Sequence, residues 1–376
     1  MSTIEIIPVE RPVEDRAFVE LGFRLNAKYP QFANQLQSDV LKVLDRTANP
    51  FWQRAERQLF LAKKDGELVG RIAAIDNHAH NECHDENVGH WGYFECTDNQ
   101  EVANALFHAA EQWVLQRGRD KILGPMNPST NDECGMLIDA FDQPPVIMMT
   151  WNPEYYLKLV ENAGHTKAKD LYAWWFVQAN VSERYRRGAE LIQRRTKAVI
   201  RSLNMDRFEE DVALVKTIYN MAWEKNWGFF PMTDAEMNHL AKALKPIVVP
   251  DLCIFAFIDD KPVGFSLTLP DYYQAMRYIR DGKLMPFGWL KLLWHIKVAK
   301  TITQLRMLVM GILPEYRSRG IDVLLYHAAI EAANRLGYQA AELSWILEDN
   351  TMMNQILENL NAKLYKRYRI YTKDLR

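Results

Sequence analysis

The spacing of apolar residues predicts the same short series of elements in both halves of the chain. In the first half, two apolar runs between Gln58 and Asp76 flank Lys64-Asp65-Gly66-Glu67. An Asp-Gly pair between two such runs is typical of a β-hairpin. A helical pattern follows from Glu101 to Arg117, and Gly118 stands where a helix commonly ends. We therefore expect a hairpin, a strand and a helix in this order.

The second half repeats this order. A hairpin is expected from Leu252 to Leu269, with Asp259-Asp260-Lys261-Pro262 as its turn. The pattern then predicts a strand over 305–313, a turn over 314–320, a helix over 321–336, a strand over 340–347 and a helix over 351–359. Because the series occurs twice, we predict a duplicated α/β fold, with domains over 1–178 and 205–376. A basic connector helix over 179–204 would join them, and a solvated surface is the simplest use of its charges.

Length, composition and charge agree with two globular domains. A chain of 376 residues exceeds one ordinary core, and 48% hydrophobic with 25% charged residues excludes a disordered or fibrous protein. Residues 1–180 hold 17 Lys and Arg against 26 Asp and Glu, whereas residues 181–376 hold 29 against 22. This division indicates an anionic ligand or partner for the second half, and it argues against nucleic acid as a partner.

The cysteines and the apolar runs bear on the compartment. Cys83, Cys96, Cys134 and Cys253 show no CxxC spacing, which favours a reducing, cytoplasmic environment. The N-terminus has no basic region followed by an apolar run, so we expect no signal peptide. No uncharged apolar window reaches about 18 residues, so we expect no membrane span.

The most informative segment runs from Met310 to Asp322. It reads Met-Gly-Ile-Leu-Pro-Glu-Tyr-Arg-Ser-Arg-Gly-Ile-Asp, so a buried strand ends at a proline and a basic turn opens a helix. Such a turn aims successive backbone N–H groups at one point, where the helix dipole adds partial positive charge. Arg317 and Arg319 add permanent charge and forked donors for phosphate oxygens. The segment indicates a phosphate site, although an ordinary strand-to-helix turn with solvated arginines also fits it.

With these residues the second half resembles the GCN5-related N-acetyltransferase (GNAT) superfamily. Arg317-x-x-Gly320-x-Asp322 matches two fixed positions of the superfamily's motif A, and Ser344 to Asn350 resembles its fifth strand and the asparagine that begins its last helix. The resemblance implies two tandem GNAT-like domains, each a mixed, mostly antiparallel sheet flanked by helices. It also implies acyl-CoA or acetyl-CoA as donor, held by Gly311, Ile312, Leu313, Arg317, Ser318, Arg319, Gly320, Ile321 and Asn350.

Two positions depart from the superfamily pattern. Many members carry a proton-donating tyrosine seven residues after the asparagine, and this chain has Leu357 there. Asp322 replaces a small residue, and its negative charge near a pyrophosphate is unfavourable unless Arg317 or Arg319 pairs with it. Both departures concern the identity of the donor and the rate of acyl transfer. Neither excludes acyl transfer, because much of this chemistry is the positioning of an amine against a thioester.

The remaining candidates for proton transfer lie near the end of the chain. Glu348 stands closest in sequence to the expected reaction site and is our candidate base, with capping of the following helix as its alternative role. Tyr365, with Tyr368 as its alternative, is the candidate for the missing proton donor.

The first half lacks the phosphate turn. Its corresponding segment, Trp91 to Gln100, has no Arg-x-x-Gly, and Asp98 and Glu101 would repel phosphate. We therefore expect a degenerate copy on the acceptor side, so that the chain resembles a tandem acyltransferase with one donor site. It is similar to a bacterial subfamily whose close relatives include the bacterial ceramide synthases, which acylate a long-chain amino alcohol from acyl-CoA. The segments shared with this subfamily are Gly124-Pro125-Met126-Asn127, Asn131-Asp132-Glu133-Cys134-Gly135, Asn226-Trp227-Gly228-Phe229 and Tyr365-Lys366-Arg367-Tyr368-Arg369-Ile370-Tyr371.

Three segments are candidates for acceptor binding, each with a plainer alternative. Asn131, Asp132 and Glu133 either bind the acceptor's ammonium or form a solvated turn. Trp227 and Phe229 either line the acceptor pocket or pack in the core. Leu284 to Lys297, rich in Trp, Leu and Lys, is either a buried or partner-facing helix or a lid that faces lipid or an acyl chain.

A cluster of imidazoles and one thiol raises the question of a metal. His78, His80, Cys83, His84 and His90 have the atom types that zinc prefers. Their spacing matches no recognised ligand pattern, and the segment follows a hairpin and is polar. We therefore expect a solvated loop there and no metal.

We predict an N-acyltransferase that moves an acyl group from acyl-CoA to a primary amine, with a long-chain amphipathic amine as acceptor. A small-molecule N-acetyltransferase and a non-catalytic acyl-CoA or acyl-carrier binding protein are the alternatives. An aminoacyl-tRNA-dependent acyltransferase shares this architecture, and the acidic first half disfavours it. The basic second half would suit contact with an acyl carrier or with the inner membrane from the cytoplasmic side. The sequence does not indicate an oligomeric state.

Overall fold

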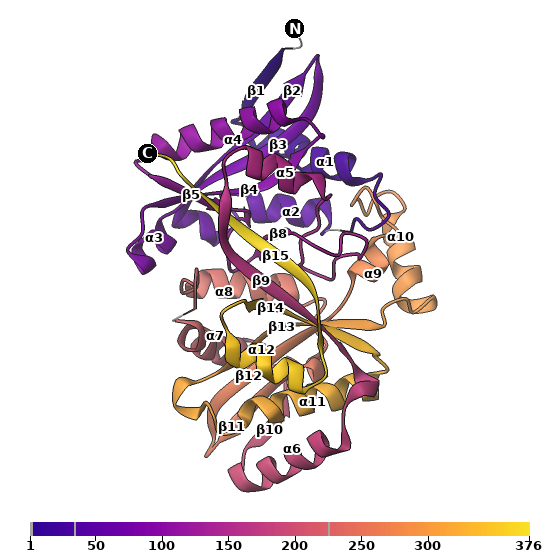
Figure 1. Cartoon of the computed structure of the whole chain (residues 1–376). Coiled ribbons are helices and arrows are strands. Elements are labelled where there is room, and N and C mark those ends of the chain that lie inside the picture. The colour runs from indigo at the N-terminus through magenta and orange to yellow at the C-terminus, as the bar shows by residue number, and fades with distance from the viewer. Residues whose placement is uncertain (1–2, 34, 225) are drawn as a thin grey trace. The chain divides into compact units, whose positions relative to one another are not determined.

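The computed structural model describes residues 3–33, 35–224 and 226–376, and the chain divides into two compact units (Figure 1). Unit 1 is built from Met1–Leu171, Tyr273–Ala299 and Lys366–Arg376. Unit 2 is built from Tyr172–Tyr272 and Lys300–Tyr365. Neither unit is continuous in sequence, and the last strand of the chain runs from unit 2 into unit 1.

The sheet of unit 1 has the order β1-β2-β3-β4-β5-β15. Its strands are β1 (Ile4–Val9), β2 (Ala55–Lys64), β3 (Glu67–Asn77), β4 (Val88–Cys96), β5 (Lys121–Gly124) and β15 (Lys363–Asp374). Neighbours are antiparallel except β4 and β5, which are parallel. Short strands β6 (Met126–Asn127) and β7 (Glu133–Cys134) pair with each other, and β8 (Met136–Leu137) pairs with β15. The helices are α1 (Asp15–Asn26), α2 (Gln37–Leu44), α3 (His78–His84), α4 (Gln100–Leu115), α5 (Tyr155–Asn162), α9 (Tyr273–Met276) and α10 (Gly288–Leu293).

The sheet of unit 2 has the order β9-β14-β13-β12-β11-β10. Its strands are β9 (Thr166–Val177), which begins in unit 1, β10 (Val199–Ser202), β11 (Cys253–Ile258), β12 (Lys261–Pro270), β13 (Gln304–Ile312) and β14 (Ala340–Leu347). The pairs from β10 to β13 are antiparallel, and β13 pairs with β14 in parallel. The helices are α6 (Glu183–Thr196), α7 (Phe208–Trp223), α8 (Asp234–Leu244), α11 (Ile321–Leu336) and α12 (Thr351–Asn359). Among the described residues, no helix is both long and apolar enough to cross a lipid bilayer.

The duplicated series of elements is confirmed. The series β2-β3-β4-α4-β5 of unit 1 recurs in unit 2 as β11-β12-β13-α11-β14. Asp65 and Gly66 have the positive φ angles of a tight two-residue hairpin turn. In the second hairpin the turn is shorter than expected, because Lys261 and Pro262 already belong to β12.

Two segments differ from the expectation. The basic stretch is helical only as α6, and Val199–Ser202 form β10, whose pairing with β11 overrides the helical pattern. The histidine segment is not a solvated loop. It forms α3, and both His80 and His90 are buried. Burial, with smaller contributions from the charges of His80 and Arg119, lowers the pKa of His90, so its imidazole is neutral.

The two faces of the unit 2 sheet carry different helices. On one face, Met307 and Leu343 share an apolar cluster with Leu324 of α11 and Leu357 of α12. On the other face, Ile218 of α7 packs with the aromatic residues of β11 and β12. Successive strand residues point to opposite faces. The side chains that flank Met307 and Leu343 therefore face the α7 side.

An ion pair joins β10 to α7. The Arg201 guanidinium donates to both Asp211 carboxylate oxygens, at 2.6 and 2.8 Å, and the Asn204 N–H donates to the same carboxylate at 2.9 Å. Burial by itself raises the pKa of Asp211, but the Arg201 hydrogen bonds outweigh it and hold this pKa below its ordinary value. The carboxylate therefore stabilises the fold above the pKa of the unfolded chain, about 4, and this contribution is lost as the pH falls through the folded pKa.

We expect Asp211→Asn to lower the free energy of unfolding by about 2 kcal/mol near neutral pH, because Arg201 loses a charged bidentate partner. Urea denaturation of wild type and variant should show a difference that shrinks at about pH 3. Glu315→Gln removes the exposed partner of Lys261 and serves as the control, with no measurable change expected in the free energy of unfolding. The same difference at both pH values would contradict this assignment.

Candidate functional site

The strands β13 and β14 part along their length. The two strands pair in parallel from Gln304, opposite Ala340, to Met307, opposite Leu343. Both strands continue beyond this point, but among the described residues they are no longer paired with each other. The register between β12 and β13 shifts at the same level, so that Leu308 is left without an opposite residue, as in a β-bulge. The edge of β13 beyond the bulge therefore faces an opening in the sheet.

The backbone groups that face this opening can be assigned. The Leu313 N–H donates to the Val263 carbonyl of β12 at 2.9 Å. In an antiparallel ladder every second residue bonds to the partner strand, so Gly311 also directs its groups at β12. Met310 and Ile312 direct theirs at the opening. Of the expected backbone contacts at Gly311, Ile312 and Leu313, Ile312 therefore faces the opening together with Met310, whereas Gly311 and Leu313 face β12.

A helix with a bare N-terminus follows this strand. After the turn over 314–320, α11 begins at Ile321, and its N-cap residue Gly320 has no side chain to cap the helix. Gly320 has φ +82, and a Cβ there would lie 2.8 Å from Ile192 of α6, so the turn requires glycine. Ser318, with φ 60, completes the sharp turn. No side chain of the N-cap residue therefore covers the first N–H groups of α11, and such groups at a helix N-terminus can bind an anion.

The two arginines of the turn have different surroundings. Arg317 donates to the Ala222 carbonyl at the end of α7, at 2.6 Å, and to the Ile312 carbonyl at 3.4 Å. It therefore ties α7 to the turn. Arg319 is exposed and lies over the ring of Tyr316, 4.9 Å from its centroid. Arg319 is the arginine better placed to meet a phosphate.

Asp322 lies on the side of α11 that faces α6. The Tyr185 hydroxyl of α6 donates to the Val323 carbonyl at 3.1 Å. Burial, followed by the charge of Asp322, raises the pKa of Tyr185 and of Tyr326 above their ordinary values. The negative charge of Asp322 thus acts on two tyrosine hydroxyls. Among the described contacts, Asp322 forms no ion pair with Arg317 or Arg319.

A buried polar network, which the sequence did not reveal, lies where β13 and β14 part. Arg306 and Glu342 stand opposite each other in the parallel register, and both are almost fully buried. Ser344 Oγ donates to Glu342 Oε1 at 2.5 Å and accepts from Arg306 Nε at 3.1 Å. The Tyr365 hydroxyl donates to Glu342 Oε2. This network lies on the α7 face of the sheet.

The other predicted catalytic positions lie nearby in the chain. Asn350 caps α12, and its Oδ1 accepts from the Met353 N–H at 3.2 Å. Glu348 follows the end of β14 and is half-buried. Leu357 is completely buried in the apolar cluster beneath α11 and α12. The structure therefore brings Tyr365 to Glu342, and the cap of α12, which was the alternative role of Glu348, comes from Asn350.

The equivalent region of unit 1 is closed by its own chain. The Asn99 side chain caps α4 by accepting from the Val102 N–H at 3.1 Å. The Tyr93 N–H of β4 donates to Asn127 Oδ1 at 2.6 Å. A Cβ on Gly92 would lie 1.7 Å from the Met126 carbonyl oxygen, so the chain packs directly on β4. The backbone groups that are open in unit 2 are occupied at these positions.

The predicted acceptor residues fall in both units. In unit 1, Ser129 Oγ donates to Asp132 at 2.6 Å and accepts from the Asn131 N–H at 3.2 Å, while Glu133 is buried and accepts from the Tyr273 hydroxyl at 3.1 Å. In unit 2, Phe229 is buried, with its ring centroid 5.4 Å from that of Tyr219, and Trp227 is half-buried. Phe229 therefore packs in the core, and Trp227 is the more accessible of the pair. Among the described residues, no group of three or more His, Cys, Asp or Glu side chains is placed to hold a metal ion.

The chain has similar proteins over its whole length. It is 39% identical over 383 residues to the bacterial ceramide synthase of Caulobacter vibrioides (strain NA1000 / CB15N), and the match covers 99% of this chain and 98% of that protein. It is 38% identical over 331 residues to protein YghO of Escherichia coli (strain K12), with 87% and 84% covered. No protein-family model matches the chain.

The fold resembles that of solved tandem GNAT proteins. A tandem GNAT protein from the clavulanic acid biosynthesis pathway superposes with a TM-score of 0.57 and 11% sequence identity, and the match covers 100% of this chain and 99% of that one. Identity this low shows the fold alone. It confirms the expected architecture of two GNAT-like domains.

The geometry of the turn predicts that Arg319 strengthens the binding of a pyrophosphate at the start of α11. We expect Arg319→Glu to raise the Kd for free coenzyme A at least about tenfold, because a charge-assisted contact contributes about 1.5–3 kcal/mol. Arg335→Glu, at the other end of the same helix, is the matched control and should leave the Kd unchanged. Isothermal titration with both variants tests this, and equal affinities would remove Arg319 from the site.

Proposed function

The chain belongs to the family of the bacterial ceramide synthase, whose fold is that of tandem GNAT acyltransferases, and from this premise we propose that it transfers an acyl group from acyl-CoA to the primary amine of a long-chain amphipathic acceptor. Membership of the family makes the chain an N-acyltransferase. The donor, the acceptor and the residue roles given below are proposed.

One arrangement in unit 2 supports the proposal most directly. The opening between β13 and β14 begins beside the Arg306–Glu342 pair, and the same strand ends at the bare N-terminus of α11. From Met307 to Ile312, β13 spans about 17 Å at about 3.4 Å per residue. This length is comparable with that of an extended pantetheine arm. A pyrophosphate at α11 would therefore place a thioester near the parting of the strands.

The backbone of β13 offers the contacts that a donor of this kind needs. Met310 presents its N–H and carbonyl groups and Ile312 its N–H at the open edge, where the amides of the arm would pair as an added strand, while the Ile312 carbonyl accepts from Arg317. Leu308 has no opposite residue in β12, so we propose its N–H as the donor to the oxyanion that forms at the thioester carbonyl. The N–H groups of Ile321 and its neighbours, with Arg319, would hold the pyrophosphate.

We assign the proton transfers of the reaction to the buried network around Glu342. An acceptor amine reaches the enzyme as an ammonium, and we assign Glu342 to take its first proton. The nitrogen then attacks the thioester carbonyl, and the C–S bond breaks. Tyr365, hydrogen-bonded to Glu342, is the proposed group that passes its proton to the departing thiolate and takes up the second proton of the nitrogen, while Glu342 returns the first proton to water. Ser344 and Arg306 hold the carboxylate in place.

For the acceptor we propose an amphipathic amine bound near these groups. The similarity to a ceramide synthase over nearly the whole chain is consistent with a long-chain amino alcohol. Trp227 is proposed as a wall for the apolar part of the acceptor. In unit 1 the carboxylate of Asp132 accepts from Ser129, and that of Glu133 accepts from the Tyr273 hydroxyl.

We expect Glu342→Gln to lower kcat by about 10²–10³-fold, because glutamine keeps the shape of the side chain and cannot take a proton. Tyr365→Phe should lower kcat by about tenfold or more. In both variants the Kd for acyl-CoA should stay within about twofold of wild type, since neither residue contacts the proposed phosphate site. Release of free thiol at saturating donor measures kcat.

Two variants serve as controls for this experiment. Glu348→Gln changes the carboxylate that the sequence favoured, and Tyr368→Phe changes a buried tyrosine of the same strand as Tyr365. Both should keep most of the activity. Loss of turnover in Glu348→Gln with full turnover in Glu342→Gln would transfer the role of base to Glu348.

The choice of substrates tests the proposed acceptor and donor. We expect kcat/KM for a long-chain acyl-CoA with a sphingoid base to exceed that for acetyl-CoA with ethanolamine by at least about 10²-fold, because each buried CH₂ contributes about 0.8 kcal/mol. Thiol release gives the rates, and mass spectrometry of the amide identifies the product. A preference for acetyl-CoA and the short amine would instead establish a small-molecule N-acetyltransferase.

A further inference from the structure

The segment Tyr273–Ala299 of unit 1 exposes many large apolar side chains. Its α10 helix continues into a π-helical turn over Trp294–Val298, and in the described structure neither contains a buried residue. Phe287 is 67% exposed and Trp294 is 57% exposed. The large apolar side chains that the segment exposes are Tyr278, Met285, Phe287, Trp289, Leu290, Leu293, Trp294 and Val298, half of all those exposed in the described part of the chain. A concentration of this kind marks an interaction surface.

Cationic side chains lie among these apolar ones. Within the segment the exposed cations are Arg277, Arg280, Lys283, Lys291 and Lys297, and Asp281 is the one acidic residue in its sequence. Lys283 is paired with Glu20 of α1 at 2.7 Å. The excess of positive charge is local, because residues 1–180, which supply most of unit 1, carry more acidic than basic residues.

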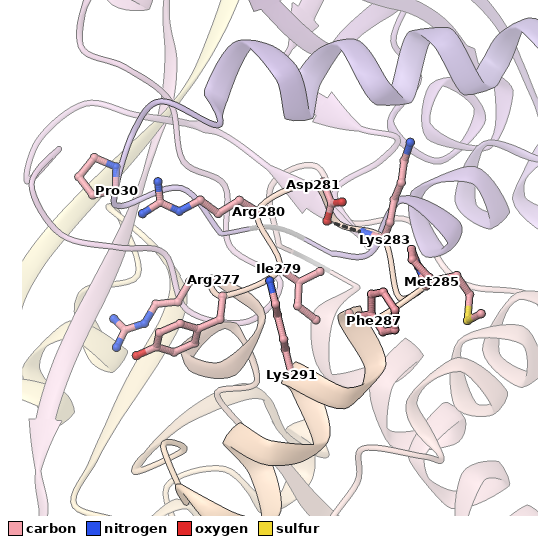
Figure 2. Close-up of a pocket in the computed structure, with 12 residues that line it drawn as sticks. Pro30, Arg277, Ile279, Arg280, Asp281, Lys283, Met285, Phe287 and Lys291 are labelled. Atoms are coloured by element: carbon pink, nitrogen blue, oxygen red, sulfur yellow. Dashed lines mark hydrogen bonds between the residues drawn. The ribbon is translucent and has the colours of Figure 1, made fainter.

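A pocket of about 770 Å³ lies at the base of this segment (Figure 2). Arg277, Arg280, Lys283 and Lys291 line it together with the apolar Phe287. Figure 2 shows the Lys291 side chain rising from α10 toward the loop that carries Ile279. The Asp281 carboxylate accepts from the backbone N–H of Lys283 at 3.2 Å, so this acidic group is directed at the loop. The pocket therefore combines several cations with an apolar wall.

From these observations we infer that Tyr273–Ala299 docks on an anionic phospholipid bilayer. The aromatic side chains of Phe287, Trp289 and Trp294 enter the interfacial layer, and Lys291 and Lys297 meet the lipid headgroups. The cationic pocket accepts a lipid phosphate. This surface belongs to unit 1 alone and does not depend on the reaction proposed for unit 2.

The mixture of residues favours a bilayer over a protein partner. Tryptophan is enriched at membrane–water interfaces, and lysine side chains can lay their aliphatic stems on apolar surface while the ammonium groups reach water or phosphate. The centre of a protein–protein interface is instead depleted in lysine. Here Lys291 lies between Trp289 and Trp294 within less than two helical turns, so burial against a protein would bury its charge.

Co-sedimentation of the full chain with lipid vesicles tests the inference. We expect the chain to bind vesicles of phosphatidylcholine with phosphatidylglycerol at least about tenfold more tightly than vesicles of phosphatidylcholine alone. Binding should weaken as the salt concentration rises, because the headgroup attraction is screened. Absence of binding to either kind of vesicle would overturn the inference and would leave an acidic protein as the alternative partner.

Two double variants with matched controls identify the surface. Lys291→Ala with Lys297→Ala should weaken binding to the mixed vesicles about thirtyfold, since about 1 kcal/mol per lysine corresponds to about fivefold each. Leu293→Ser with Trp294→Ser should weaken it at least about tenfold. Lys158→Ala and Leu336→Ser, exposed positions on α5 and α11, are the controls and should bind as wild type does.

The results separate this inference from the proposed reaction. Both double variants should release thiol at the wild-type rate when the acceptor is supplied in detergent micelles, because neither changes unit 2. Full binding by both double variants, or equal losses in the controls, would place the lipid contact elsewhere and overturn the inference.

Discussion

The site in unit 2 depends on one constraint: two parallel strands that stop pairing leave a row of backbone groups with unmet hydrogen-bonding capacity. β13 and β14 pair only as far as Met307 and Leu343, and the bulge at Leu308 turns the remaining edge of β13 into the opening. Such an edge must be satisfied by water, by the protein or by a ligand. A ligand with its own amide groups meets this requirement better than a purely apolar one.

The two units differ in what binds the corresponding backbone N–H groups. In unit 1 side chains of the unit itself bind them, since Asn127 accepts from the Tyr93 N–H and Asn99 caps α4. In unit 2 the corresponding helix begins at Gly320, which can offer no side-chain cap. The charge division between the two halves of the sequence does not follow the two units, because Tyr273–Ala299 and Lys366–Arg376, which are both basic, belong to unit 1.

Local signals explain why most elements were predictable from the sequence. A turn sequence such as Asp259-Asp260 or a terminal glycine such as Gly337 acts within a few residues, so the second hairpin, α11, β14 and α12 were predicted nearly to the residue. The turn over 314–320 was predicted for the same reason. The Arg306–Glu342–Tyr365 network was missed because it depends on the register of strands far apart in sequence. A carboxylate inside the apolar run Ala340–Leu347 was the one available signal.

The groups proposed to transfer protons lie on one face of the unit 2 sheet because the two faces differ in polarity. Leu357 is sealed in the apolar cluster under α11 and α12, where a tyrosine hydroxyl would need a polar partner that the cluster does not supply. On the opposite face Glu342 is just as deeply buried, yet Ser344 and Tyr365 donate hydrogen bonds to it, and Arg306 donates in turn to Ser344. A buried carboxylate loses several kcal/mol of hydration and persists only with such partners. An ammonium arriving beside it would supply a further partner, so acceptor binding and proton transfer depend on the same desolvated group.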